Sequence, residues 1–186
     1  YQYADSANLV YSDGYRGIQT TTRHLIDNGH KKIGYVGSLG QYKVAKDRLN
    51  AYKNTLEDFN IPFVEEWLFE GDYSTKSGID AAKYFLSCPS KPSAIVFAND
   101  AMAVGALKHF IAMGVSVPDD IAIIGFDDID LCELVTPSLS SYRQPIEQIA
   151  KSAMDLFLEY MEDPLMAKKQ IVLDGSLVVR NSSKKV

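Results

Sequence analysis

The chain alternates short apolar segments with longer segments in which apolar residues recur every three or four positions. A short run rich in β-branched residues is typical of a buried strand, and the longer spacing is typical of one face of a helix. Because strand and helix units follow one another repeatedly, we predict an α/β fold whose parallel sheet is covered on both faces. The expected strands are 8–12, 32–37, 67–72, 94–100 and 121–128.

Helices are expected between and after these strands. The first, second and last span about 15–28, about 43–59 and 146–162. The third begins after Ser74, which caps it, and the fourth follows the strand at 94–100 and ends before Gly114. The predicted inner faces are Ile18, Thr22, Leu25 and Ile26 in the first helix, Val44, Leu49, Tyr52, Leu56 and Phe59 in the second, and Ile146, Ile149, Ala153, Phe157 and Tyr160 in the last. Strands 170–173 and 176–180 follow, and the Asn-Ser-Ser-Lys-Lys tail is expected to fray.

Composition and charge exclude several classes of protein. The 186 residues are 46% hydrophobic and 11% aromatic, which is enough for one large domain or two small ones. The formal net charge of -5 argues against binding of nucleic acid by this chain itself, because that affinity comes from clustered Lys and Arg. No apolar run approaches the roughly 18 residues of a membrane span, and Tyr1 opens a polar segment. We therefore expect no membrane contact and a cytoplasmic location. Cys88 and Cys132 lack Cys-x-x-Cys spacing and are expected to be reduced, half-buried thiols.

Polar side chains gather where the predicted strands end. In open α/β sheets, ligands bind in the crevice beyond the carboxyl ends of the strands. Those ends carry Ser38–Tyr42, Gly71–Tyr73, Asn99–Asp100 and Gly125–Asp128. Carboxylates and amides bind pairs of hydroxyl groups, and aromatic rings cover the apolar side of a sugar, so these ends predict recognition of a polyol. Asp100 and Asp128 have an alternative interpretation as caps of helices or turns, whereas the pattern at Asp127 favours ligand binding.

Six stretches in a fixed order resemble the effector-binding domain of the lac repressor (LacI/GalR) family of bacterial transcription regulators. They are SDGYRGIQTTTRHLIDNGHKKIGYVG, KDRLNAYKNTLEDFNI, GDYSTKSGIDAAKYFL, PSAIVFANDAMAVGAL, GVSVPDDIAIIGFDDI and TPSLSSYRQPIEQIAKSAMDLF. The resemblance implies a type I periplasmic-binding-protein-like fold. In that fold two parallel-sheet lobes close on a small molecule between them.

The resemblance also implies where the chain passes from one lobe to the other. The expected crossovers are Asp13 to Gly14, Gln144 to Pro145, and Asp174 to Gly175. Residues 1–13 and 145–174 would form part of the N-terminal lobe, and residues 14–143 and 175–186 a nearly complete C-terminal lobe. The DNA-binding domain of the family is absent from this chain.

The effector contacts of the family can be carried over residue by residue. They fall on Asp13, Arg48, Tyr73, Asn99 and Asp127, and Tyr42 and Val44 occupy positions that vary with specificity in relatives. The planar donors of an arginine suit ligand hydroxyls or a carboxylate better than those of a lysine. The chain departs from the family at Gly14, where Asn is commoner and where Gly would loosen the crossover, and at Ala51, which replaces a glycine.

The function implied by the resemblance is regulation of transcription by a small molecule. An effector, a sugar or a related metabolite, would bind between the lobes and change the operator affinity of a homodimer. Operator DNA would contact a domain that this chain lacks, and no cofactor is implied. The stretch LCELV, 131–135, is a candidate dimer contact, with ordinary burial within the lobe as the alternative.

Other classes of function find less support in the sequence. The three histidines, His24, His30 and His109, share no metal-ligand spacing, and we expect no metal. No Gly-x-Ser-x-Gly elbow, dinucleotide fingerprint or P-loop occurs, so we expect no enzyme, including one of the flavodoxin-like class. The alternative is a periplasmic sugar-binding protein of a transporter, which shares the fold. An upstream helix-turn-helix would favour the regulator, and an upstream signal peptide would favour the transporter.

Overall fold

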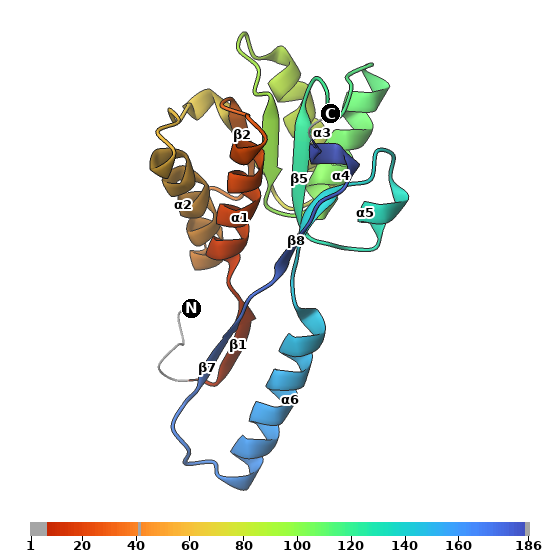
Figure 1. Ribbon diagram of the computed structural model, residues 1–186. Coiled ribbons are helices and arrows are strands. Elements are labelled where there is room, and N and C mark those ends of the chain that lie inside the picture. The colour runs from red at the N-terminus through yellow and green to blue at the C-terminus, as the bar shows by residue number, and fades with distance from the viewer. Residues whose placement is uncertain (1–6, 41, 185–186) are drawn as a thin grey trace.

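The computed structural model describes residues 7–40 and 42–184, whose strands form two separate sheets (Figure 1). One sheet has six strands in the order β3-β2-β4-β5-β6-β8, and the other pairs β1 with β7. The elements in chain order are β1 (Leu9–Ser12), α1 (Gly14–Asp27), β2 (Ile33–Gly37), α2 (Lys43–Asp58), the 3-10 helix η1 (Glu65–Trp67), β3 (Leu68–Glu70), α3 (Thr75–Ser87), β4 (Ala94–Phe97), α4 (Asp100–Ala112), β5 (Ala122–Asp127), α5 (Leu131–Leu134), β6 (Ser140–Arg143), α6 (Ile146–Glu162), β7 (Gln170–Leu173), β8 (Ser176–Val178) and the 3-10 helix η2 (Asn181–Ser183).

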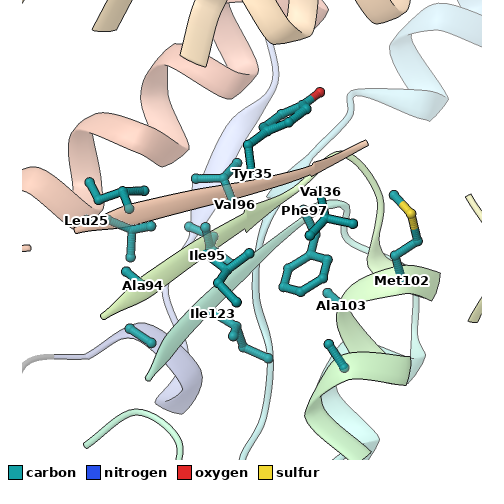
Figure 2. Close-up of a cluster of buried hydrophobic side chains, with 14 of the residues drawn as sticks. Leu25, Tyr35, Val36, Ala94, Ile95, Val96, Phe97, Met102, Ala103 and Ile123 are labelled. Atoms are coloured by element: carbon teal, nitrogen blue, oxygen red, sulfur yellow. The ribbon is translucent and has the colours of Figure 1, made fainter. Parts of the chain in front are cut away.

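The six-stranded sheet carries the hydrophobic core. Its strands are parallel except β8, which runs antiparallel to β6. The helix pairs α1–α2 and α3–α4 lie on opposite sides of this sheet (Figure 1). The central strands β2 and β4 are buried along their whole length, and Figure 2 shows Ile95, Phe97 and Ile123 among the side chains that fill the space beside them. The predicted α/β class with parallel sheets is confirmed.

The second sheet is small and leaves its helix poorly covered. Strands β1 and β7 run parallel, from Leu9 opposite Gln170 to Ser12 opposite Leu173, and α6 lies beside them (Figure 1). The prediction that Ile146 and Phe157 lie on a buried face of α6 is wrong for this chain, because they are 60% and 55% exposed. Two short strands offer too little surface to cover a long amphipathic helix. Leu156 is the single buried residue of this fully described helix.

Three short connections join the two sheets. The first is Asp13 between β1 and α1, the second is Gln144 and Pro145 between β6 and α6, and the third is Asp174 and Gly175 between β7 and β8. They lie close together in the middle of Figure 1. We refer to them below as the first, second and third connections. The assignment of these segments to an N-terminal and a C-terminal lobe stays a prediction. Residues 1–6 of the first lobe and 185–186 of the second lie outside the described residues.

Several predicted boundaries differ from the structure for local reasons. The strand expected at 94–100 ends at Phe97, because Asn99 already caps α4. The strand expected at 67–72 is shorter, since Trp67 belongs to η1. Strand β6 was not predicted, because its sequence SSYR lacks apolar alternation although three of its four residues are buried. Phe59 is 40% exposed rather than buried, and the guanidinium of Arg23 lies 5.9 Å from the centre of its ring.

The prediction of a frayed tail is wrong for Asn181–Ser183; Lys184 is exposed and outside any element, and Lys185 lies outside the described residues. Ser182 and Ser183 are buried, and residues 181–183 form η2. The hydroxyl of Ser182 donates to the carbonyl of Ile123 at 2.7 Å and accepts from the backbone N–H of Ser140 at 2.8 Å. Small hydroxyl side chains can satisfy strand backbone groups inside a core, which a polar composition does not reveal.

We predict that Ser182→Ala lowers the free energy of unfolding by about 1 to 3 kcal/mol, because it leaves the buried N–H of Ser140 without its partner. Denaturant unfolding measures the change. The control is Ser87→Ala, whose exposed hydroxyl bonds only within its own helix and whose loss is expected to change stability by less than about 0.5 kcal/mol. Equal effects of the two substitutions would show that the tail is not anchored through Ser182.

Candidate functional site

The backbone is unusual at the carboxyl edge of the six-stranded sheet. Four non-glycine residues among the described ones have positive φ, and three of them lie here: Tyr73 at 68°, Asp127 at 115° and Asp128 at 59°. Such conformations cost on the order of 1 to 3 kcal/mol each and persist where the surrounding structure holds them. Strain of this kind concentrates at binding sites, so this edge is the first place to look for function.

Arg48 of α2 lies at the centre of this edge. Its guanidinium stacks on the ring of Phe126, with Cζ 4.0 Å from the ring centre, and Nη1 donates to the carbonyl of Ala98 at 2.5 Å. Phe126 in turn stacks on Tyr142, with ring centres 5.2 Å apart. The hydroxyl of Tyr142 accepts from the backbone N–H of Gly175 at 2.8 Å, so the stack reaches the third connection.

Gly14, the residue after the first connection, lies against Arg48. A Cβ atom at Gly14 would lie 3.3 Å from Nε of Arg48, which is tighter than ordinary van der Waals contact. The departure from the family at this position therefore has a local consequence, because a larger residue would press on the arginine. Asp13 caps α1 by accepting from the backbone N–H of Arg16 at 3.0 Å.

Asp127 joins the same cluster through the second connection. Its Oδ1 accepts from Nε2 of Gln144 at 2.6 Å. Burial raises the pKa of this carboxyl, and the hydrogen bond from Gln144 and the positive charge of Arg48 oppose the rise. Asp127 makes no hydrogen bond to the backbone of the loop that follows it, at least among the described residues. Its hydrogen bond to Gln144 therefore ties the sheet edge to the second connection.

Asn99 and Tyr73 form a second pair. Oδ1 of Asn99 accepts from the N–H of Met102 at 3.1 Å and caps α4, and its Nδ2 donates to the carbonyl of Tyr73 at 2.9 Å. Both ends of the amide group are therefore bonded within the protein. Asn99 holds the loop that presents Tyr73, whose side chain is 36% exposed.

Two cavities are lined by other predicted site residues and not by Arg48 or Asp127. Tyr42, 72% exposed, and Tyr73 line a cavity of about 520 Å³ together with Ser38, Phe69, Glu70, Gly71, Asp72, Ser77 and Asp80. Asp13 and Val44 line a smaller one of about 190 Å³ beside the first connection. The structure thus brings Arg48 near Asp127 and Tyr42 near Tyr73, while Asp13 faces a separate cavity.

Asp100 and Asp128, for which the sequence left open a role as caps of helices or turns, both have partners within the protein. Asp100 is fully buried and accepts from the N–H of Ile129 at 3.0 Å and from the hydroxyl of Ser141 at 2.6 Å. Asp128 pairs with Arg143 and Arg180, each at 2.6 Å. Asp100 therefore fastens the turn after β5, and Asp128 fixes it through ion pairs rather than as a cap.

Sequence reasoning missed residues that the structure places in the cluster. Phe126 was placed among the strand-end residues but given no role of its own, although it carries the arginine, and Gln144 was named only as a crossover position. The signal for Gln144 was available, because residues at a crossover necessarily pass the cleft. Among the described residues no helix is long and apolar enough to cross a membrane, and no group of three or more His, Cys, Asp or Glu residues is arranged to hold a metal ion.

Comparisons with known proteins identify the family. Residues 22–183 match the periplasmic binding protein-like domain family. The chain belongs to this family. One curated relative is the HTH-type transcriptional repressor PurR of Photobacterium profundum. It is 31% identical over 175 residues, which cover 94% of this chain and 52% of the repressor. The chain spans about half the length of the curated relatives it matches.

Solved structures agree with this family. A transcriptional regulator LacI from Bacillus cereus subsp. cytotoxis NVH 391-98 has a TM-score of 0.92 and 27% identity, over 99% of this chain and 65% of that one. The complex of the transcriptional regulator CelR with cellobiose has a TM-score of 0.89 and 27% identity, over 96% of this chain and 54% of that one. The expected resemblance to LacI/GalR effector-binding domains and the periplasmic-binding-protein-like fold are confirmed.

We predict that Asp100 makes stability depend on pH. Burial raises its pKa from 3.8 to about 6, so the folded state holds the proton more tightly than the unfolded chain does. Stability from this group is therefore present below pH 3.8 and is lost as the pH rises to about 6, by roughly 2 to 3 kcal/mol. In Asp100→Asn the amide can still accept from Ile129 and donate to Ser141, and this loss disappears.

Denaturant unfolding of both proteins between pH 4 and about 7 measures the difference. The control is Asp80→Asn, which removes an exposed carboxyl whose pKa is lowered by a hydrogen bond from Lys83 and therefore cannot flatten the profile. Parallel profiles for the wild-type protein and Asp100→Asn would contradict the assignment of this pH dependence to Asp100.

Proposed function

We propose that this chain is the effector-binding part of a cytoplasmic LacI-type transcriptional regulator. The observation that carries the proposal is the cluster of Arg48, Phe126 and Asp127 at the carboxyl edge of the sheet, with all three connections attached to it. A ligand bound to this cluster touches the segments that link the two sheets. Binding there is therefore coupled to the relative position of the two parts.

The proposed effector is a sugar or a related metabolite. Arg48 offers hydrogen-bond donors, Asp127 offers acceptors, and Tyr73 and Tyr42 supply exposed aromatic surface beside a cavity of about 520 Å³. Hydroxyl groups donate and accept, so a polyol satisfies both kinds of partner at once. The cellobiose complex of the similar regulator CelR supports a sugar. Asp13 is proposed as a further contact from its cavity beside the first connection, and Asn99 as the residue that positions Tyr73.

The proposed output is altered affinity of a homodimer for operator DNA, which binds through a domain outside this chain. Residues 1–13 and 145–174 are proposed as part of the N-terminal lobe and the remainder as the C-terminal lobe. An effector shifts the lobe arrangement only by its difference in affinity for the two states, typically about 1 to 3 kcal/mol. Leu131 and Leu134, 42% and 77% exposed, support LCELV as a dimer contact, while Cys132 is buried.

The alternatives receive less support. The relatives described above are named as transcriptional regulators, which does not favour a sugar-binding protein of a transporter. We propose no catalytic role, because the described polar groups at the sheet edge are held by caps, ion pairs and stacking, and the serine that bonds to a carboxylate there, Ser141 with Asp100, is fully buried.

We predict that Arg48→Ala or Asp127→Ala, in the intact protein, weakens effector binding by about 1.5 to 3 kcal/mol, because each removes a charged hydrogen-bonding group. A panel of sugars screened by thermal shift identifies the ligand, since a ligand of the folded state raises the melting temperature. Isothermal titration calorimetry then measures the affinities of the wild-type and variant proteins.

The matched control is Arg23→Ala. Arg23 also lies over an aromatic ring, but on the exposed side of α1, and its side chain is 65% exposed. We expect its removal to leave effector affinity unchanged. If Asp127→Ala unfolds more easily yet binds the effector as tightly as the wild type, Asp127 belongs to the scaffold and not to the binding site.

A further inference from the structure

Two stacked tyrosines in the core differ in one respect. Tyr35 of β2 and Tyr52 of α2 stack with ring centres 5.2 Å apart, and both are fully buried. The hydroxyl of Tyr52 donates to the carbonyl of Ile33 at 2.7 Å. The hydroxyl of Tyr35 is buried and has no hydrogen-bond partner among the described residues. Figure 2 shows this hydroxyl pointing away from the aliphatic side chains of Ile95 and Ile123.

An unpaired buried hydroxyl is costly, so its position needs a reason. Buried polar groups are nearly always hydrogen-bonded, and one left without a partner costs about 1 to 3 kcal/mol. A phenylalanine would fill the same space in the core without that cost. A tyrosine at this position is therefore unfavourable for folding unless its hydroxyl meets a partner that is not part of the described chain.

The Tyr35 hydroxyl lies at the carboxyl edge of the sheet, beside the Arg48 cluster. A Cβ atom added at Gly37 would be 2.7 Å from this hydroxyl and 2.7 Å from the Cβ of Ala98. Only glycine leaves that space open. The carbonyl of Ala98 accepts from Arg48. The charge of Arg48 also lowers the pKa of Tyr35, although burial raises it more.

Arg48 has an unused donor as well. Its Nε is buried and has no hydrogen-bond partner among the described residues, and the same holds for the hydroxyl of Ser12 at the end of β1. The buried side-chain nitrogen and oxygen atoms of the described residues that lack a hydrogen-bond partner are therefore those of Ser12, Tyr35 and Arg48. Two of these residues are linked through Ala98: Arg48 donates to its carbonyl, and the Tyr35 hydroxyl lies beside its Cβ.

We propose that Tyr35 is a specificity-determining residue of the effector site, whose hydroxyl donates to an oxygen of the effector that Nε of Arg48 also approaches. The inference rests on the proposed effector-binding function and deepens it. Tyr73 lies near enough to act electrostatically on Tyr35, and its backbone is held by Asn99.

The proposal restricts the chemistry of the effector. The end that meets Tyr35 and Arg48 carries an acceptor oxygen, because both groups arrive as donors without partners. The end that meets Asp127 carries a donor, because a carboxylate accepts. A sugar with free hydroxyl groups meets both requirements. A sugar acid meets the first with its carboxylate, whereas a hydrocarbon or a simple amine fails at the first.

Tyr35→Phe tests the proposal, with Tyr52→Phe as the matched control, in the intact protein. Each substitution removes one hydroxyl from the same ring stack. We expect Tyr35→Phe to unfold at no lower denaturant concentration than the wild type, and Tyr52→Phe to unfold at a lower one, because only Tyr52 loses a hydrogen bond. Equal destabilisation by both substitutions would mean that the Tyr35 hydroxyl has a structural partner and would overturn the proposal.

The second measurement is affinity for cellobiose, D-ribose and D-glucuronate by titration calorimetry. For any of these probes that binds the wild-type protein, we expect Tyr35→Phe to weaken binding about tenfold and Tyr52→Phe to leave it unchanged within about twofold. Binding by the wild type that Tyr35→Phe leaves intact overturns the Tyr35 proposal and leaves the proposed function standing. Absence of binding by the wild type to all three probes contradicts the proposed sugar effector and, with it, the role of Tyr35.

Discussion

The stack of Arg48 on Phe126 and of Phe126 on Tyr142 is the contact on which the arrangement of this chain depends. It begins on α2, crosses β5 and ends on β6. All three connections between the two sheets lie near it: Gly14, which follows the first, packs against the arginine, Gly175 of the third donates to the hydroxyl of Tyr142, and Gln144 of the second donates to Asp127, the residue after Phe126. A guanidinium over an aromatic ring contributes roughly 0.5 to 2 kcal/mol, and more where it is shielded from water.

In the proposed function, this stack is the route by which effector binding is coupled to the arrangement of the two sheets. A ligand that takes up the free Nε of Arg48 acts on a group that packs against Gly14, next to the first connection, and that reaches the third connection through Phe126 and Tyr142. An ion pair between Arg16, in the first turn of α1, and Asp174 joins the segment after the first connection to the third connection.

The sequence predicted the sheet, the main helices and the edge that carries the polar residues, because apolar periodicity and strand ends are local features. It failed where a role depends on distant partners. The serine-rich segments of β6 and η2 read as loop and tail, yet the buried hydroxyls of Ser182 and Ser183 bond to the neighbouring strands. Tyr35 read as core, since only the structure shows that its hydroxyl lacks the partner that Tyr52 has. The prediction that one face of α6 is apolar is correct, but the prediction that this face is buried is wrong, because the two short strands beside it offer too little surface to cover it.

The central claim is that an effector binds at the carboxyl edge of the six-stranded sheet, against the Arg48 stack. The most direct test is a crystal structure of the intact protein bound to a sugar that raises its melting temperature. The result predicted is a sugar with one oxygen within hydrogen-bonding distance of Arg48 and another within reach of Asp127. A sugar found elsewhere, for example in the groove lined by Arg16, Arg23 and His24, with Arg48 still lacking a partner at Nε, would contradict it.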